Sequence, residues 1–511
     1  MRSAAGARTT LPVRRARPVA LAGVIALLAG CATSAGLLPS SRPRNPANFA
    51  VSRTLRSTAV DGRWPQQDWW TSLDDPALDR LIEEGLAGSP SLKEAEARTR
   101  LALAAAQAAG GARQPEIGLA GSTTRELFPQ HWIVPPPYGG EWSTQNALAV
   151  SLGYDLDLWG EYRSTYERAL DASHAAALDV EAARVALSTA IAHAYVAMQR
   201  AYLERDVERT LLAERARLYA LTRQRHAAGI DSLLDVRQAQ SALPDARERI
   251  TQLDETLRLS RDALAALIGQ GPDRGRELVR PRLAPPPPPA LPSRLPAQLL
   301  GRRPDILALR SRIESAHEGI AAAKARFYPN VNLAALAGVE ALGTGALFTA
   351  ANRELGVGPA FSLPIFDGGV LRAHLARRDA QYDLAVARYD QALADALRDV
   401  VDQVVSLHSI AAQRMELREG LATAQGAYDL ALLRYRNGVG NYLQVLATHE
   451  QVLAQRQLGV ALEARAWDAS IDLVRALGGG YVPGRAIDPA PHAGRTAGGP
   501  RRARASRRQG R

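Results

Sequence analysis

Residues 147–158, ALAVSLGYDLDL, alternate between apolar side chains and small or acidic ones. All six even positions, from Leu148 to Leu158, are apolar, whereas the odd positions hold alanine, serine, glycine and aspartate. A period of two predicts a β-strand with one apolar face and one face of small or acidic residues. On this pattern Asp155 and Asp157 lie on the polar face.

Three further segments, at about residues 115–124, 329–338 and 355–365, are predicted to be strands of the same kind. Each has about the length of a tilted membrane strand, roughly 9–11 residues. The chain is therefore expected to contain four strands. Their apolar faces carry, besides the residues above, Ile117, Leu119, Val331, Leu333, Leu355, Val357, Phe361, Leu363 and Ile365.

Four strands with an apolar face can be accommodated in two ways. In a bilayer a sheet must close so that no edge is left unpaired, and bacterial barrels have eight or more strands. Membrane insertion would therefore require strands pooled from a dimer or a trimer, with the small and acidic positions lining the lumen. The alternative is a soluble antiparallel sheet packed against helices.

The chain contains a tandem duplication with a period of roughly 210 residues. Pro90 and Pro304 occupy matching positions, and RHAAGIDSLLDV at 225–236 matches RYRNGVGNYLQV at 434–445. Each copy is predicted to run in the order helix, strand, strand, very long helix, turn, helix.

The duplication and the composition divide the mature chain into segments. The first copy spans 63–279 and the second 297–482. The segment between them, 280–296, contains five consecutive prolines and is predicted to be an extended polyproline II linker. Residues 483–511 form an arginine-rich tail that is predicted to be disordered.

The helices are predicted to be unusually long. No proline occurs from Tyr138 to Leu243, and Leu187, Ile191 and Tyr195 begin a series of apolar residues at heptad-like steps of three and four. A helix from Tyr162 to about Arg225 would measure on the order of 95 Å at 1.5 Å per residue. Rods of this length are typical of coiled-coil bodies.

Residues 1–30 are predicted to be a secretory signal peptide. They combine five arginines and no acid with an apolar run that is too short to span a bilayer. Leu28 to Cys31, LAGC, resembles the bacterial lipobox, which implies diacylglycerol and N-acyl lipid on Cys31 and a lipidated extension over 31–62. The alternative is an incidental cysteine after an ordinary cleavage site. Cys31 is the only cysteine, so a disulfide within one chain is excluded.

The net charge of +11 is concentrated at the two ends of the chain. The body between the signal peptide and the tail is nearly neutral, which argues against a nucleic-acid partner. The sequence has no Walker A loop, no G-x-S-x-G elbow and no metal-binding histidine or cysteine spacing. We therefore expect neither an enzyme nor a metal or other cofactor site.

Five motifs along the body resemble the TolC-like outer-membrane efflux protein family. They are WWTSLDDPALDRLIEEGLAGSPSLKEAEARTR at 69–100, GRRPDILALR at 301–310, ARFYPNVNL at 325–333, LPIFDGG at 363–369 and RYRNGVGNYLQVL at 434–446. Together with the lipobox they are similar to the NodT-type lipoprotein branch. The resemblance covers about residues 63–480.

The resemblance implies a mainly α-helical homotrimer whose twelve-stranded outer-membrane β-barrel continues into a long α-helical coiled-coil barrel in the periplasm. It implies a lipid-anchored, passive exit duct for drugs or other small toxic compounds. The expected partners are a periplasmic adaptor protein and an inner-membrane pump, commonly of the RND class.

The resemblance also implies that the two helix turns form a periplasmic tip that contacts the adaptor. Family members often carry an acidic residue where this chain has Gly440, so one acidic residue per protomer, Asp231, is expected there. Tyr435 and Tyr442 are expected to narrow the pore together with Asp231, and Asp155 and Asp157 to face the lumen of the barrel. The predicted tip residues are Arg225, Gly229, Ile230, Asp231, Leu234, Arg434, Gly438, Val439, Gly440, Asn441 and Leu443.

Two other functions remain open from the sequence. One is the outer-membrane outlet of a type I-like protein or peptide secretion system. The other is a lipid-anchored periplasmic scaffold without a pore, although such a scaffold has no need for paired strands with an apolar face.

Overall fold

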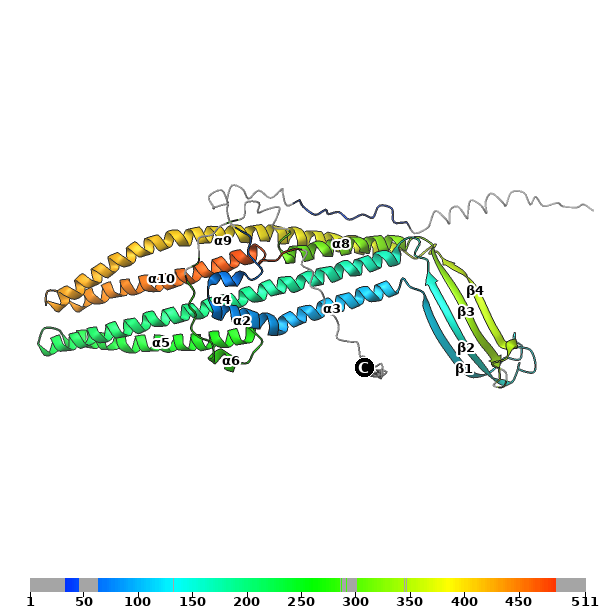
Figure 1. The fold of residues 1–511 in the computed structure, drawn as a ribbon, viewed down its shortest axis with the longest axis horizontal. Coiled ribbons are helices and arrows are strands. Elements are labelled where there is room, and N and C mark those ends of the chain that lie inside the picture. The colour runs from blue at the N-terminus through cyan, green and yellow to red at the C-terminus, as the bar shows by residue number, and fades with distance from the viewer. Residues whose placement is uncertain are drawn as a thin grey trace, which may run out of the picture.

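The computed structural model describes residues 33–45, 63–131, 133–284, 286, 291, 301–343, 345 and 347–483. Cys31, most of the proline-rich linker and the arginine-rich tail lie outside the described residues. The described chain is an elongated rod, with two helical hairpins ending at one end and a four-stranded sheet at the other (Figure 1).

The structure confirms the duplication, because matching helices of the two copies have equal lengths. The helices α3 (Pro90–Gly111) and α8 (Pro304–Ala325) have 22 residues each. The long helices α4 (Glu161–Ala227) and α9 (Val370–Arg436) have 67 each, which corresponds to about 100 Å. The returning helices α5 (Leu233–Leu267) and α10 (Tyr442–Ala476) have 35 each.

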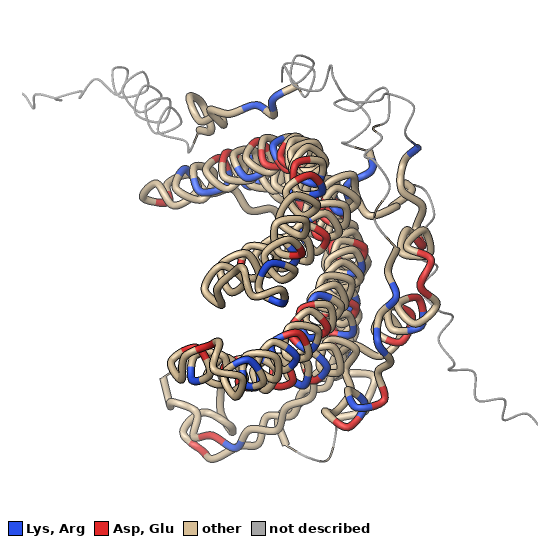
Figure 2. The backbone as a smooth tube through the Cα atoms, turned by 90° about the vertical axis from the view of Figure 1, so that its left-hand side faces the viewer, with Lys and Arg blue, Asp and Glu red and all other residues tan. Residues whose placement is uncertain are grey.

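Shorter elements pack near the middle of the rod. They are η2 (Trp69–Leu73), α2 (Pro76–Gly88) and α6 (Pro272–Arg276). Seen from the tip end, the helices form a curved wall that is open on one side (Figure 2). Lysine and arginine alternate with aspartate and glutamate along this wall. None of the helices within the described ranges has an apolar stretch long enough to cross a membrane.

The four strands form one antiparallel sheet in the order β1-β2-β3-β4. They are β1 (Glu116–Leu127), β2 (Trp142–Asp155), β3 (Asn330–Leu342) and β4 (Arg353–Ser362), and a short η3 (Ala350–Asn352) precedes β4. The register brings the apolar positions of all four strands to one face, with Leu119 opposite Val150, Val150 opposite Ala337, and Ala337 opposite Leu355.

The apolar face of the sheet is uncovered in the single chain. Val357 is 90% exposed, Leu355 77% and Leu119 71%. The outer edges of β1 and β4 pair with no other strand among the described residues. A single chain therefore leaves an exposed apolar surface and two sheet edges with unpaired backbone groups. Both features favour association with a partner.

Two strands end earlier than the alternating pattern predicted, whereas β1 and β3 continue to Leu127 and Leu342. The second strand ends at Asp155 instead of 158, because Asp157 adopts a φ of 37° and its carboxylate accepts hydrogen bonds from the backbone N–H groups of Tyr162 and Arg163 at 2.9 and 2.8 Å. Asp157 thus lies outside β2, in the connection before α4, and its predicted position facing a lumen stays a prediction. The fourth strand ends at Ser362 because Pro364 has no N–H group to continue the ladder.

The heptad positions predicted from the sequence form the helical core. Ile191, Tyr195 and Met198 of α4 are fully buried, as is Leu393 of α9. They belong to two clusters, one centred on α2, α4 and α5 and the other on α9 and α10. Each copy therefore contributes its own core, and α4 joins them by packing against both α8 and α10.

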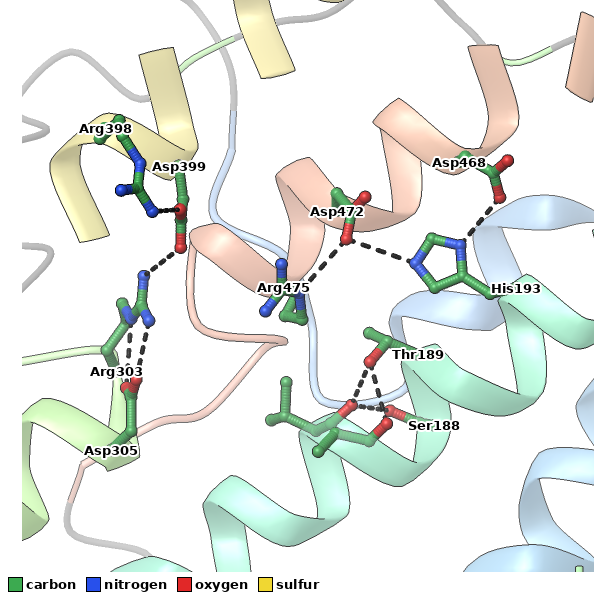
Figure 3. A network of polar contacts seen from close by, with 12 residues as sticks. Ser188, Thr189, His193, Arg303, Asp305, Arg398, Asp399, Asp468, Asp472 and Arg475 are labelled. Carbon is green, nitrogen blue, oxygen red and sulfur yellow. Dashed lines mark hydrogen bonds and ion pairs between the residues drawn. The ribbon is translucent and has the colours of Figure 1, made fainter. Parts of the chain in front are cut away.

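A charged cluster fastens α4 of the first copy to α10 of the second (Figure 3). The His193 ring nitrogens lie 2.8 Å from Asp468 Oδ1 and 3.3 Å from Asp472 Oδ1. Two carboxylate acceptors require both ring nitrogens to carry a proton, which is the imidazolium form. The hydrogen bonds to Asp468 and Asp472 accordingly raise the pKa of His193 to about 9.

We predict that this cluster makes stability depend on pH. Because the pKa of His193 is raised, its contribution is fully present below about pH 6.5 and is lost as the pH rises through about 9. His193→Gln should remove about 1–2 kcal/mol at pH 6, a value reduced for partial exposure to water. Thermal unfolding of the detergent-solubilised channel measures this difference, which should vanish near pH 10. A difference that stays constant from pH 6 to 10 would contradict it.

Candidate functional site

The two helix turns at the tip have the same backbone geometry. Gly229 and Gly438 follow α4 and α9 in the left-handed region, with φ of 77° and 78°. The next N–H groups bond back to the carbonyls of Arg225 and Arg434, at 2.9 and 3.0 Å. This is the Schellman ending of a helix, and only glycine adopts its left-handed position without strain.

A side-chain cap starts the returning helix of each turn. Ser232 accepts a hydrogen bond from the N–H of Asp235, and Asn441 accepts one from the N–H of Gln444 at 2.9 Å. These caps satisfy backbone donors that a helix start leaves without an intrahelical acceptor. The chain therefore reverses within a few residues at both places.

Apolar side chains are exposed around both turns. Each turn presents one branched residue directly after its glycine, Ile230 at 59% and Val439 at 68% exposure. Leu233, Leu234 and Leu443 add to this surface at 57%, 65% and 56%. We call these five residues the tip surface. Uncovered apolar side chains concentrated at the end of a rod are typical of a protein interaction site.

Beneath the tip surface, Arg225 connects the two hairpins. Its guanidinium donates two parallel hydrogen bonds to Asp231, at 3.0 and 3.1 Å, and a third to the backbone oxygen of Tyr435 at 2.5 Å. The guanidinium carbon also lies 4.3 Å from the centre of the Tyr435 ring. The Tyr435 hydroxyl donates to Asp231 and contacts the Thr222 hydroxyl at 2.9 Å.

The ionisation of this group follows from its contacts. Burial alone would raise the pKa of Asp231, but hydrogen bonds from Arg225 and Tyr435 outweigh it and hold the pKa below its usual range. Burial and the hydrogen bond to Asp231 raise the pKa of Tyr435 to about 12. The aspartate is therefore ionised and paired, and the tyrosine hydroxyl keeps its proton.

The residues predicted to narrow the pore are buried within the single protomer, and their role in a constriction stays a prediction. Asp231 and Arg225 each have side chains only 9% exposed, and Tyr435 and Tyr442 are 0% and 3% exposed. The two tyrosine rings meet edge to face with centroids 6.4 Å apart, inside a small core that also contains Val445. The aromatic rings and the carboxylate therefore hold the hairpins together instead of projecting from the protomer.

The second turn lacks the ion pair of the first. Gly440 occupies the position that matches Asp231, and Arg434, which matches Arg225, is exposed and has no ion pair among the described residues. A Cβ at Gly440 would lie 3.0 Å from the backbone nitrogen of Tyr435, so the turn has little room for a side chain there. Among the described residues, the tip thus has one ion pair, between Arg225 and Asp231, and one arginine without an ion pair, Arg434.

Sequence reasoning missed a second polar contact between the hairpins. His449 of α10 is 3% exposed, bonds Glu214 of α4 at 2.7 Å and stacks on Tyr428 with ring centroids 4.7 Å apart. Arg456 contacts the same carboxylate at 3.2 Å. The spacing of His449, four residues after Val445 and three before Val452, places it at a core heptad position. This spacing could have predicted a buried histidine that needs a polar partner.

At the opposite end, Asp155 lies where the sheet joins the helices. Its carboxylate accepts hydrogen bonds from Tyr162, Asn330 and Asn332 at 2.9 to 3.1 Å. The residue thus ties β2 to β3 and to α4. Its predicted position on the small, polar face agrees with the register, and its contact with a lumen stays a prediction.

A family model and individual relatives match this chain over both copies of the duplication. The family described as outer membrane efflux protein matches residues 81–270 and 295–479, one segment in each copy. The fusaric acid resistance protein FusA of Burkholderia cepacia is 39% identical over 367 residues, covering 71% of this chain and 69% of FusA. The multidrug resistance outer membrane protein MdtP of Escherichia coli K12 is 28% identical over 478 residues, covering 91% and 96%.

A solved structure agrees with these sequence similarities. The outer membrane protein VceC of Vibrio cholerae superimposes with a TM-score of 0.77 at 36% identity, covering 82% of this chain and all of VceC. The shared fold therefore extends over both copies of the duplication, including the sheet and the long helices.

Proposed function

This chain belongs to the outer membrane efflux protein family, and from that premise we propose that three copies form the exit duct of a tripartite efflux system. Four strands from each copy would close a twelve-stranded barrel in the outer membrane. The long helices would continue it as a tunnel through the periplasm. The duct conducts passively, since the driving energy belongs to an inner-membrane pump, for which the RND class is proposed.

The observation that carries this proposal is the sheet with one continuous, uncovered apolar face and two unpaired edges. In hydrocarbon an unpaired N–H or C=O group costs several kcal/mol, so a membrane sheet must close on itself. Four strands are too few to close, whereas a ring of copies joins β4 of one to β1 of the next. The opposite face carries Ser151, Gly153, Ala149 and similar small residues, which leaves room for water inside.

Channel recordings and gel mobility test the duct. The purified full-length protein should migrate as a trimer in unheated SDS gels, collapse to a monomer on heating, and give discrete single-channel currents in planar bilayers. A protein that stays water-soluble and monomeric after removal of the proposed lipid would refute the duct and favour the scaffold.

The proposed cargo is drugs or other small toxic compounds. The names of two relatives denote resistance to fusaric acid and to multiple drugs, which supports this class for the present chain. Deletion of the gene should lower the resistance of the host to such compounds, and the full-length gene should restore it. A deletion that affects only the secretion of a protein or peptide would support the secretion outlet instead.

We propose that the tip surface contacts a periplasmic adaptor protein. The double substitution of Ile230 and Val439 by aspartate places two charges in that surface, so we expect resistance to fall to near the level of the deletion strain. Trimer yield should be unchanged because both side chains are exposed. The conservative pair Ile230→Val and Val439→Ile is the control and should keep resistance. Full resistance in the aspartate variant would exclude the tip as the docking site.

We propose that Cys31 carries the lipid and anchors the mature N-terminus. Cys31→Ser should abolish incorporation of labelled fatty acid and reduce the amount of channel in the outer membrane. The proposed pore is formed by the strands of the sheet and not by the lipid. Variant trimers that do reach the membrane should therefore conduct normally. Labelling that persists in the variant would place the acylation elsewhere.

A further inference from the structure

The junction of β2 and α4 lies at the base of the sheet (Figure 1). Residues of this junction line a cavity of about 470 Å³. Its walls include Tyr154 and Leu158 from the end of the strand segment, Trp159 from the connection to α4, and Arg113 and Arg163 from the surrounding helix ends. Asp155 and Asp157 also line it, so the cavity combines two cations and two carboxylates with apolar and aromatic side chains.

The acidic residues of this cavity are already occupied by donors. Asp155 accepts hydrogen bonds from Tyr162, Asn330 and Asn332, and Asp157 accepts the two backbone N–H groups that begin α4. The uncommitted charges of the cavity are therefore its two guanidinium groups.

Neither arginine has an ion-pair partner within the described ranges. The guanidinium carbon of Arg113 lies 5.3 Å from the centre of the Tyr166 ring, a contact that leaves its N–H donors free. Arg163 is exposed, and only its backbone N–H is engaged, by Asp157. Two unpaired arginines facing one cavity favour a doubly coordinated oxyanion, because guanidinium groups bind phosphate with charge-assisted hydrogen bonds.

The apolar wall of the cavity continues the apolar face of the sheet. Tyr154 stands opposite Leu333 in the register and follows Leu152 on the same face. Trp159 is held rigidly, since its indole N–H donates to the backbone oxygen of Pro329 at 2.8 Å and its ring stacks on Tyr328 at 4.6 Å. Aromatic residues with one apolar and one polar side are enriched where a membrane meets water.

We propose that this cavity binds the headgroup of a glycerophospholipid. Arg113 and Arg163 hold the phosphodiester, and the acyl chains extend along the apolar face past Tyr154. This rests on the proposed insertion of the sheet, which places the cavity at the periplasmic boundary of the outer membrane. The contacts are the charge-assisted hydrogen bonds that guanidinium groups make with phosphate oxygens.

Native mass spectrometry of the full-length trimer tests the site. The delipidated protein is titrated with dioleoyl phosphatidylglycerol and, in parallel, with dioleoylglycerol, which has the same chains and no phosphate. The variant carries Arg113→Gln and Arg163→Gln together. The matched control is Arg100→Gln, an exposed arginine of α3 about 20 Å along the helix from Arg113.

We expect wild type and Arg100→Gln to retain the phospholipid about tenfold more tightly than the double variant, a difference of the size of one charge-assisted contact. Dioleoylglycerol should bind all three proteins equally. Equal retention of the phospholipid by wild type and double variant would overturn the inference. Complete displacement by excess inorganic phosphate would also overturn it, because the cavity would then recognise free phosphate and not a lipid.

Trimer mobility and single-channel current are measured on the same preparations. A double variant that forms conducting trimers and still binds phospholipid like wild type refutes the lipid site and leaves the duct intact. Absence of trimers or currents in the wild-type protein refutes the duct itself.

Discussion

Val150→Arg should abolish formation of the stable trimer in the outer membrane. Val150 lies near the middle of β2 on the apolar face, between Leu119 of β1 and Ala337 of β3. An arginine facing lipid near the bilayer midplane costs about 2–4 kcal/mol, and a trimer contains three copies, so the total reaches about 6–12 kcal/mol. This is comparable to the whole stability of a typical domain.

The neighbouring residue provides the control. Ser151 follows in the same strand but points to the opposite face, where small residues predominate. Ser151→Arg should therefore still give a heat-modifiable trimer, with altered conductance or ion preference as the visible effect. Comparing the outer-membrane trimer of the two variants on unheated SDS gels is the measurement. If Val150→Arg assembled as well as Ser151→Arg, the apolar face would not be the lipid-facing one.

Asp231→Asn should loosen the tip by weakening the contacts of Asp231 with Arg225 in its own turn and with Tyr435 of the second hairpin. The substitution keeps the size of the side chain and removes the charge that Arg225 and Tyr435 bind. Loss of one partner of a buried ion pair costs about 3–5 kcal/mol, and we expect about 3 kcal/mol because the tip is close to water. The expected results are larger or more frequent single-channel openings and faster protease cleavage between residues 225 and 234.

The duplication supplies the control for this variant. Arg434 matches Arg225 in the second turn but has no ion pair among the described residues, so Arg434→Gln should leave both conductance and cleavage unchanged. Tyr435→Phe should fall between the two, because it removes the hydrogen bonds of the hydroxyl to Asp231 and Thr222, each worth about 1 kcal/mol, and keeps the ion pair. Identical behaviour of Asp231→Asn and wild type would show that the pair does not hold the tip closed.

The tip pair and the His193 cluster should respond to pH in opposite ranges. The pKa of Asp231 is held below its usual value, so its contribution is present above about pH 4 and is lost only as the pH falls further. The contribution of His193 is lost as the pH rises toward 9. Mild acidification to pH 5 should therefore leave both contacts in place.

Local patterns in the sequence determined much of this protein. The period of two in residues 147–158 and its counterparts predicted four strands, and proline-free stretches predicted the two long helices. The matched turns at Gly229 and Gly438 revealed the duplication. These features depend on residues close together in the chain, where backbone geometry and side-chain spacing act directly. They sufficed to predict the element order, whereas the outer-membrane efflux fold was implied by the family resemblance of the five motifs.

The tertiary structure decided which side chains meet across the duplication. Residues 225 and 231 of the first turn lie about 200 positions from Tyr435, and no local pattern indicates that a tyrosine expected in a pore would be buried against them. Asp157 left the predicted strand because its carboxylate binds the N–H groups that begin α4. The partners of Tyr435 are supplied by the three-dimensional packing, whereas those of Asp157 are backbone N–H groups only five and six residues along the chain. In both cases hydrogen bonding outweighed the alternation or resemblance read from the chain.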